Sequence, residues 1–262
     1  MRIATWNVNS VRRRIDLVAR FVQESAPDVL CLQEIKCREA EFPTSALADM
    51  GLPHLHIVGQ KGLHGVAIAS RLAIQPLANP DICPHGEARS AAVHIAGVEI
   101  HSLYIPAGGD EPDVEINPKF GHKLESLARL RSQYAKRPKS APPLVITGDL
   151  NVAPGENDVW SHRQLLNVVS HTPVETQALE AARTEAGLID LARQFHPNAE
   201  KLFTWWSYRS PDWQRNDRGR RLDHIWACPK AAKRASAFTI ARACRSWEGP
   251  SDHVPVVCDF AG

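Results

Sequence analysis

The sequence predicts an α/β fold in which two packed mixed β-sheets are flanked by helices. Short apolar runs typical of buried strands alternate with helical stretches, and polar clusters follow strands in both halves of the chain. The chain has 262 residues, of which 44% are hydrophobic, and its composition shows no break that would mark a linker. We therefore expect a single domain over residues 1–262.

The first half of the chain predicts mostly strands, with two helices. A strand pattern covers residues 2–6, and apolar residues then recur at helical spacing from Val11 to Val22, with Ser10 as the expected N-cap. Gly51 and Pro53 end the second helix. The remaining elements expected here are a strand at 28–33, a helix at 39–50, and strands at 55–58, 66–70, 91–95 and 98–105.

The second half begins with an amphipathic helix that runs from about Phe120 to Tyr134. Three prolines stop this helix before a buried strand that begins at Leu144. The elements expected after this strand are helices at 159–169 and 175–194 and strands at 222–227, 237–243 and 254–260.

Four short polar clusters lie next to the apolar runs, so each would sit at the tip of a buried strand. Their side chains suit metal-assisted phosphoryl chemistry. This chemistry needs oxygen ligands for Mg²⁺ and a histidine that can stabilise the charge that develops during the reaction. Taken alone, three of the clusters could be simple turns or caps, whereas the carboxylate of Glu34 at the end of an apolar run needs a cation or an open edge. Together they carry the ligand set of one hard cation, which predicts a shared site. The clusters are Trp6-Asn7, Gln33-Glu34, Gly148-Asp149-Leu150-Asn151 and Ser251-Asp252-His253.

Two further residues could complete this site. Asp223 could accept a hydrogen bond from the imidazole of His253 and fix its tautomer, the alternative being a structural ion pair with Arg221. Tyr104 lies in a strand and could place its hydroxyl at the site, the alternative being core packing.

A basic, aromatic stretch covers residues 201–234. It holds nine Lys or Arg against three Asp, a local excess of six, whereas the whole chain has a net charge of only +2. Cations interleaved with rings are typical of surfaces that grip phosphates and stack bases or sugars. A solvated basic loop beside core tryptophans is the alternative. The rings are Trp205, Trp206, Tyr208, Trp213 and Trp226.

Apolar runs in this chain are shorter than the roughly 18 to 20 residues that a membrane helix needs. A strand pattern starts at Met1 without a signal stretch, so we expect the protein to reside in the cytoplasm, which in a bacterium includes the nucleoid. We expect no membrane partner. The six cysteines form no Cys-x-x-Cys pair, and we expect them to be reduced and structural.

These motifs resemble the exonuclease III family of abasic-site endonucleases, within the larger endonuclease/exonuclease/phosphatase superfamily. The resemblance covers nearly the whole chain and implies a four-layered α/β sandwich with pseudo-twofold halves. The segment from Gly59 to Ala67 resembles the DNA-repair branch of the superfamily. The other segments that carry the resemblance are Thr5-Trp6-Asn7-Val8-Asn9, Leu32-Gln33-Glu34-Ile35-Lys36, Tyr104-Ile105-Pro106, Gly148-Asp149-Leu150-Asn151, Arg221-Leu222-Asp223-His224 and Ser251-Asp252-His253.

The resemblance implies a metal site and a group that activates water. Glu34 would be the principal Mg²⁺ ligand, with Asn7 and Asp252 nearby and Mn²⁺ as an alternative ion. Asp149 would orient and deprotonate the attacking water, while Asn151 supports it and donates to the phosphate. Both could instead contact a second metal ion.

It also implies the groups that stabilise charge. His253, held by Asp223, would hydrogen-bond a non-bridging phosphate oxygen, and Tyr104 would stabilise the developing charge or the leaving oxygen. The reaction implied is hydrolysis of a DNA phosphodiester with the 3′ oxygen leaving. An abasic site would be cut on its 5′ side to leave a 3′ hydroxyl, and duplex 3′ ends would undergo exonuclease and 3′-phosphatase reactions.

The implied partner is double-stranded DNA, bound by a monomer. Family members build the pocket for an extrahelical abasic sugar from the positions of Trp205 and Leu222. Arg220 stands where many relatives carry a bulky apolar residue, so the balance between abasic-site cleavage and exonuclease activity is open. Candidate phosphate contacts include Arg12, Lys61 and Arg89. The alternatives are a superfamily nuclease that acts on RNA or general duplexes, and a non-catalytic nucleic-acid-binding regulator of the same fold.

Overall fold

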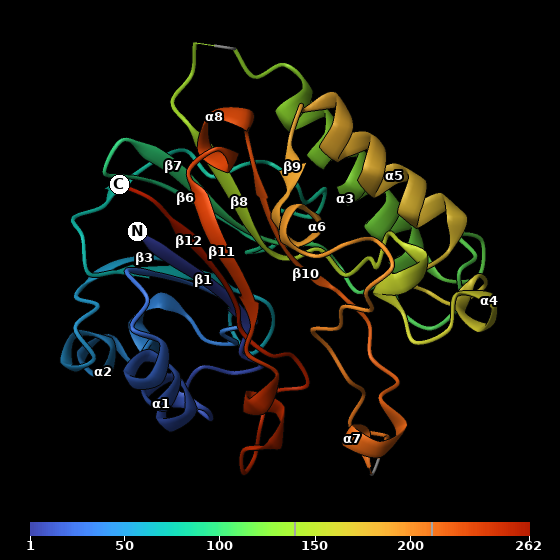
Figure 1. Ribbon diagram of the computed structural model, residues 1–262, viewed down its shortest axis with the longest axis horizontal. Coiled ribbons are helices and arrows are strands. Elements are labelled where there is room, and N and C mark those ends of the chain that lie inside the picture. Colours follow the sequence, from blue (N-terminus) through green and yellow to red (C-terminus); the bar gives the residue numbers. More distant parts are fainter. Residues whose placement is uncertain (139, 211) are drawn as a thin grey trace.

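The computed structural model describes residues 1–138, 140–210 and 212–262, and its core is a pair of six-stranded mixed sheets (Figure 1). The first sheet has the strand order β11-β12-β1-β2-β4-β3. Its strands are β1 (Arg2–Asn7), β2 (Val29–Gln33), β3 (His54–Val58), β4 (Val66–Ser70), β11 (Ala235–Ile240) and β12 (Val256–Phe260).

The second sheet has the strand order β5-β6-β7-β8-β10-β9. Its strands are β5 (Gln75–Pro76), β6 (Ser90–Ile95), β7 (Val98–Tyr104), β8 (Leu144–Asp149), β9 (Ile189–Asp190) and β10 (Asp223–Ala227). Both sheets share one plan, because a central parallel pair, β1–β2 or β7–β8, lies between antiparallel neighbours. This repetition is the pseudo-twofold relation that the resemblance implies.

Helices cover the outer faces of the two sheets, so the molecule has four layers (Figure 1). Each parallel pair is joined by a helix, as a parallel crossover requires. These helices are α1 (Ile15–Ser25) and α3 (Pro118–Ala135). The other helices are α2 (Thr44–Asp49), α4 (His162–Leu165), α5 (Pro173–Glu185), α6 (Leu191–Phe195), α7 (Trp213–Asn216) and α8 (Pro229–Ala232), with 3₁₀ turns at Glu39–Glu41, Glu156–Asp158 and Arg242–Ser246.

The core between the sheets is rich in small and β-branched side chains. Ile3 and Val29 from the first sheet pack in one fully buried cluster with Ile100, Val145 and Ile225 from the second. Alternate residues of the same strands face outward onto the helices, which is why these strands are apolar on both faces. The rigid double sheet holds the strand ends in fixed positions.

Several predicted element boundaries are wrong. The first helix begins at Ile15 and has Arg14 at its N-cap, while the expected cap Ser10 has a left-handed φ of 86°. The helix expected at 39–50 is interrupted at Pro43, and the helix expected at 159–169 is a single turn. The helix expected at 175–194 is two helices separated by β9, and the strand expected at 237–243 ends at Ile240.

None of the helices in the described ranges is long and apolar enough to cross a membrane. Within the same ranges, all six cysteines are free, and five of them are buried. Their burial agrees with the expected structural use of cysteine as a small apolar side chain.

Candidate active site

The site lies where strands of both sheets end side by side. Asn7 is the last residue of β1 and Glu34 follows β2, while Tyr104 and Asp149 are the last residues of β7 and β8. Asp223 begins the antiparallel strand β10 and pairs directly with Asp149. The parallel pairs therefore bring residues that are far apart in the sequence to one edge, as the polar clusters predict.

Left-handed backbone conformations turn the chain immediately after two of these strands. Glu34 has a φ of 52° and Asn151 a φ of 53°. Asparagine adopts this conformation more readily than glutamate, so the turn at Glu34 is the more strained of the two. Gly148 is also constrained, because a Cβ atom there would lie 1.9 Å from the carbonyl oxygen of Leu103 on the neighbouring strand.

The Asn7 amide joins the two halves of the site. Its Nδ2 donates to Glu34 Oε1 at 2.9 Å and to Asp149 Oδ2 at 2.8 Å. Tyr104 donates its hydroxyl to the same Glu34 oxygen at 2.9 Å. Two carboxylates from different sheets are thus held close together by an amide that has no exposed surface.

Glu34 is ionised despite its partial burial. Burial by itself would raise the pKa of the Glu34 carboxyl, but the Lys36 ammonium at 2.8 Å and the hydrogen bond from Asn7 lower the pKa below its ordinary value. Burial raises the pKa of Tyr104 well above its ordinary value, and the charges of Glu34 and Asp149 raise it further. Tyr104 therefore stays protonated and can donate.

His253 lies between two buried carboxylates. Its Nδ1 is 2.8 Å from Asp223 Oδ2, and its Nε2 is 3.7 Å from Asp149 Oδ2. Burial alone would lower the pKa of His253, but the attraction of Asp223 and Asp149 outweighs burial and raises the pKa to about 10. The expected Asp223–His253 hydrogen bond is therefore present and favours an imidazolium.

The pKa of Asp149 is also raised, which for a carboxyl group favours the neutral form. Burial raises its pKa to about 7, against the attraction of His253, and the nearby charges of Asp223 and Glu34 act in the same direction as burial. A carboxylate with this pKa can take a proton near neutral pH. The backbone N–H of Asn151 donates to Asp149 Oδ1 at 2.9 Å and its Nδ2 to Asp149 Oδ2 at 3.1 Å, so Asn151 supports Asp149 as expected.

A buried ion pair beneath the site was missed by the sequence analysis. Lys123 and Glu175 have no exposed side-chain surface, and their charged atoms are 2.5 Å apart. The ammonium also donates to the carbonyl oxygen of Asn151 at 2.7 Å. The available signal was a lysine on the apolar face of the helix that contains Phe120 and Leu127. Lys123 therefore fixes the turn that carries Asn151.

Lys123→Met should lower the free energy of unfolding by about 3 to 5 kcal/mol, because it leaves the buried Glu175 carboxylate without its counter-charge. Urea denaturation measures this loss. Lys119→Met, at an exposed position one turn earlier in the same helix, is the control and should change the free energy by less than about 0.5 kcal/mol. Equal stability of the two variants would contradict the supporting role of Lys123.

Asp252 is held at the same edge by its own partners. Its Oδ1 accepts from Asn9 Nδ2 at 3.2 Å, and its Oδ2 accepts from the Trp205 indole at 3.0 Å. Neither Asn9 nor this use of Trp205 was expected from the sequence. The side chain of Trp205 therefore both orients a predicted metal ligand and forms part of the cavity wall.

An open cavity of about 710 Å³ lies over these groups. Its polar floor and apolar wall come from residues that the sequence analysis singled out separately. The predicted residues that line it are Glu34, Asp149, Asn151, Trp205, Arg220, Leu222, Asp252 and His253. Trp160, Val168 and Val169 extend the wall, and no sequence signal marked them.

The predicted DNA contacts separate into different environments. Arg12 and Lys61 are exposed. Arg89 is only 4% exposed, its Nε donates to Glu87 at 2.6 Å, and its guanidinium lies 4.7 Å from the centre of the Tyr104 ring. This placement does not favour the phosphate contact expected for Arg89 and gives it a supporting position beneath Tyr104.

Arg220 is anchored in the cavity wall. Its Nη1 donates to the carbonyl oxygen of Val169 at 2.9 Å and to the hydroxyl of Ser170 at 2.7 Å. The guanidinium lies 5.3 Å from the centre of the Trp205 ring. Arg220 is therefore a fixed part of the wall.

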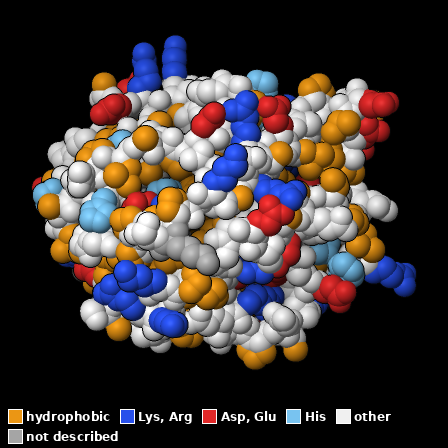
Figure 2. Space-filling view, turned by 90° about the horizontal axis from the view of Figure 1, so that it is seen from above, with side chains coloured by type: hydrophobic (Ala, Val, Ile, Leu, Met, Phe, Trp, Pro, Cys, Tyr) orange, Lys and Arg blue, Asp and Glu red, His pale blue; other side chains and the backbone are white. Residues whose placement is uncertain are grey.

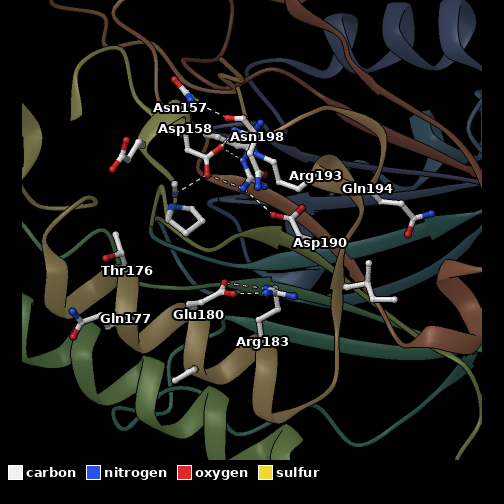
Figure 3. A pocket seen from close by; sticks show the side chains of 16 residues that line it. Asn157, Asp158, Thr176, Gln177, Glu180, Arg183, Asp190, Arg193, Gln194 and Asn198 are labelled. Carbon is white, nitrogen blue, oxygen red and sulfur yellow. Dashed lines mark hydrogen bonds and ion pairs between the residues drawn. The ribbon is translucent and has the colours of Figure 1, made fainter. Parts of the chain in front are cut away.

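Arg221 lies outside this site, and it does not pair with Asp223. It binds Asp158 at 2.6 Å and Asp190 at 2.8 Å. Asp158 also binds Arg193, and these residues are among those that line a separate cavity of about 1000 Å³ (Figure 3). The network anchors the start of β10, which leaves Asp223 free to bind His253.

The basic, aromatic stretch is divided between the core and the cavity of the site. Trp206 and Trp226 are buried in the core, whereas Trp205, Arg209 and Arg218 line the cavity of the site. Seen from the α8 end, basic and acidic side chains are interspersed on the surface (Figure 2). The arginines of this stretch that line the cavity are Arg209, Arg218 and Arg220.

Comparison with known proteins identifies the family. Residues 4–253 match the Endonuclease/Exonuclease/phosphatase family. Exodeoxyribonuclease III of Haemophilus influenzae is 29% identical over 99% of this chain and 100% of its own. An AP endonuclease structure from Archaeoglobus fulgidus is 34% identical and covers 99% of both chains, with a TM-score of 0.90.

A second group of solved structures comes from Neisseria. A 3′-5′ exonuclease from Neisseria meningitidis is 33% identical over 100% of both chains, with a TM-score of 0.90. A Neisseria 3′ phosphatase bound to a product DNA hairpin is 32% identical over the same shares, also with a TM-score of 0.90. The chain therefore belongs to the exonuclease III family within the Endonuclease/Exonuclease/phosphatase family, and it is a DNA repair nuclease that hydrolyses phosphodiesters.

Proposed function

We propose that this nuclease hydrolyses the phosphodiester 5′ of abasic sites, and removes nucleotides or phosphates at duplex 3′ ends, leaving a 3′ hydroxyl. The observation that carries the proposal is that Trp205 and Leu222 line the same cavity as the acid, amide and imidazole groups. Its apolar wall suits a sugar without a base, and its polar floor suits the adjacent phosphate. The names of the similar structures include an AP endonuclease and a 3′ phosphatase.

The residues at the strand ends fit Mg²⁺. Glu34, Asp149 and Asp252 line one cavity and offer carboxylate oxygens, which this hard ion prefers. Glu34 already attracts a cation, the Lys36 ammonium, and Asp223 Oδ1 is buried without a hydrogen-bond partner among the described residues. We expect Glu34, Asn7 and Asp252 to hold the ion, with Asp149 and Asn151 available to a second one.

Bound Mg²⁺ would neutralise charge that develops on the phosphate. The chain's own groups would do the rest. Asp149, with a pKa of about 7, would take the proton of the attacking water. The His253 imidazolium would donate from Nε2 to a phosphate oxygen, and the Tyr104 hydroxyl would donate toward the leaving oxygen. Asn151 Nδ2 also donates to the carbonyl oxygen of Ile105 at 2.9 Å, so any donation to phosphate must replace one of its present bonds.

Metal removal tests the cofactor proposal. We expect EDTA to abolish cleavage, Mg²⁺ to restore it fully and Mn²⁺ to restore it in part, while binding of duplex DNA in EDTA persists. Cleavage assays and a fluorescence binding assay on the same preparation measure both. Full cleavage in EDTA would contradict the metal assignment.

Arg220→Leu tests the pocket. If the anchored guanidinium narrows the wall, the leucine variant should raise the ratio of abasic-site incision to 3′ exonuclease activity by about 10-fold, roughly the effect of 1.4 kcal/mol. Arg215→Leu, at an exposed position of α7, is the control. An unchanged ratio in Arg220→Leu would place Arg220 outside the part of the pocket that selects substrate.

The candidate phosphate contacts and the working environment are also proposals. We expect the exposed Arg12 and Lys61 to contact the DNA backbone, because their charges are free to meet phosphates. We propose that the chain acts as a monomeric single domain in the cytoplasm or nucleoid. Light scattering of the purified protein, with and without a DNA duplex, measures the oligomeric state.

A further inference from the structure

A second cluster of ligating side chains lies beside the catalytic site. Cys83 and Glu87 come from the loop that leads into β6, and His122 comes from α3. Cys83 Sγ is 3.3 Å from His122 Nε2 and 3.8 Å from Glu87 Oε2, and that oxygen is 4.0 Å from His122 Nε2. One sulfur, one nitrogen and one oxygen atom therefore face a common point.

These separations match those of a tetrahedral zinc site. With Zn–S near 2.3 Å and Zn–N and Zn–O near 2.0 to 2.2 Å, neighbouring ligand atoms stand about 3.4 to 3.6 Å apart. Each of the three observed separations lies within about 0.4 Å of that range. The kinds of donor atom also favour zinc, because a thiolate with an imidazole selects zinc over the hard Mg²⁺.

The surroundings hold these side chains in place. Cys83 is 6% exposed, and Glu87 accepts from Arg89 Nε at 2.6 Å, a type of outer hydrogen bond that commonly orients metal ligands. His64 Nε2 lies 3.4 Å from the other Glu87 oxygen. The His85 ring is exposed and stands 4.2 Å from the His122 ring, so the fourth ligand position is left to His85 or to water.

We propose that Cys83, Glu87 and His122 bind one Zn²⁺ ion in a structural site separate from the catalytic centre. The ion would fasten the loop before β6 to α3, two elements that are otherwise distant in the sequence. The same loop carries Arg89, whose guanidinium packs on the Tyr104 ring. The site would therefore stabilise the support of the catalytic tyrosine.

Cobalt substitution distinguishes this site from the catalytic one. Asp149, Asp223 and His253 also form a group that could bind a metal ion, but it contains no cysteine. A thiolate-to-Co²⁺ charge-transfer absorption therefore reports only the Cys83 site. We expect the full-length protein in excess Mg²⁺ to develop this band with one equivalent of Co²⁺ and to lose it when Zn²⁺ is added.

Variants decide the assignment. Cys83→Ser should remove the band, His122→Gln and Glu87→Gln should weaken Co²⁺ binding about 10-fold or more, and Cys228→Ser, at a partly buried position elsewhere, should match the wild-type protein. Zn²⁺ should raise the melting temperature of the wild-type protein but not of Cys83→Ser.

A wild-type protein without the band, or an unchanged band in Cys83→Ser, would overturn the proposal. The first result would leave a plain thiol–imidazole hydrogen bond as the account of the 3.3 Å contact. If Cys83→Ser does not fold, unchanged Co²⁺ affinity in both His122→Gln and Glu87→Gln would overturn it equally.

Discussion

Glu34→Gln should lower metal-dependent cleavage by about 10³-fold, the effect of losing about 4 kcal/mol of transition-state stabilisation. Glutamine keeps the size of the side chain and an oxygen that can accept from Asn7 and Tyr104, so the variant removes mainly the negative charge. Affinity for duplex DNA should stay within about threefold, since Glu34 lies at the floor of the cavity. Single-turnover cleavage and DNA binding measure the two effects separately.

The matched control is Glu39→Gln, an exposed carboxylate five positions later in the chain. It should cleave at the wild-type rate, because it contributes no oxygen to the cavity. A rate within threefold of wild type for Glu34→Gln would mean that its charge does not serve the metal. A parallel loss of DNA affinity would instead indicate a disordered site.

Asp223→Asn should lower kcat by about 10²-fold or more with little change in KM, because it weakens the hold on the His253 imidazolium. Burial lowers the pKa of His253, and the Asp223 carboxylate is the group that raises this pKa most. Removing its charge must therefore lower the pKa of His253 in the variant. The imidazole of the variant then loses its proton at a lower pH than in the wild-type protein. The deficit should therefore widen as pH rises and narrow as pH falls.

This pH dependence separates positioning and charge from simple damage to the fold. A structural defect would lower activity by a similar factor at every pH and would also lower the melting temperature. Asp212→Asn is the control, since it removes an exposed carboxylate in the same half and asparagine still caps α7. Normal activity of Asp223→Asn would make Asp223 a structural residue.

The convergence of the site could be predicted from the sequence because strand geometry is simple. Runs such as residues 29–33 and 144–149 end in polar groups, and parallel strands bring their carboxyl ends to one edge. Asp223 is brought to the same edge because it pairs with Asp149 across β10 and β8. The polar tips were therefore predictable from local pattern alone.

Helix boundaries were less predictable, for local reasons. Pro43 restricts the residue before it and splits the stretch at 39–50, a signal that the apolar periodicity masked. Gly187, with a φ of 65°, ends the long stretch at 175–194 and turns the chain into β9. Apolar spacing therefore marked where helices form better than where they stop.

Side-chain partners across the fold could not be predicted, because they depend on packing between distant elements. Lys123 meets Glu175 only after α3 and α5 pack together, and Arg89 contacts Tyr104 only because the loop before β6 lies beside the end of β7. From the sequence alone, each of these cations could equally face solvent, contact DNA or pair with a carboxylate. Only the tertiary structure assigns them.

The most direct test of the proposed function compares single-turnover cleavage of matched duplexes that carry one abasic-site analogue or none. With Mg²⁺ we expect rapid incision 5′ of the analogue, a 3′ hydroxyl product, and much slower shortening of the intact duplex from its 3′ end. Equal rates on the two duplexes would contradict an abasic-site preference and would indicate a nuclease of general duplexes or 3′ ends.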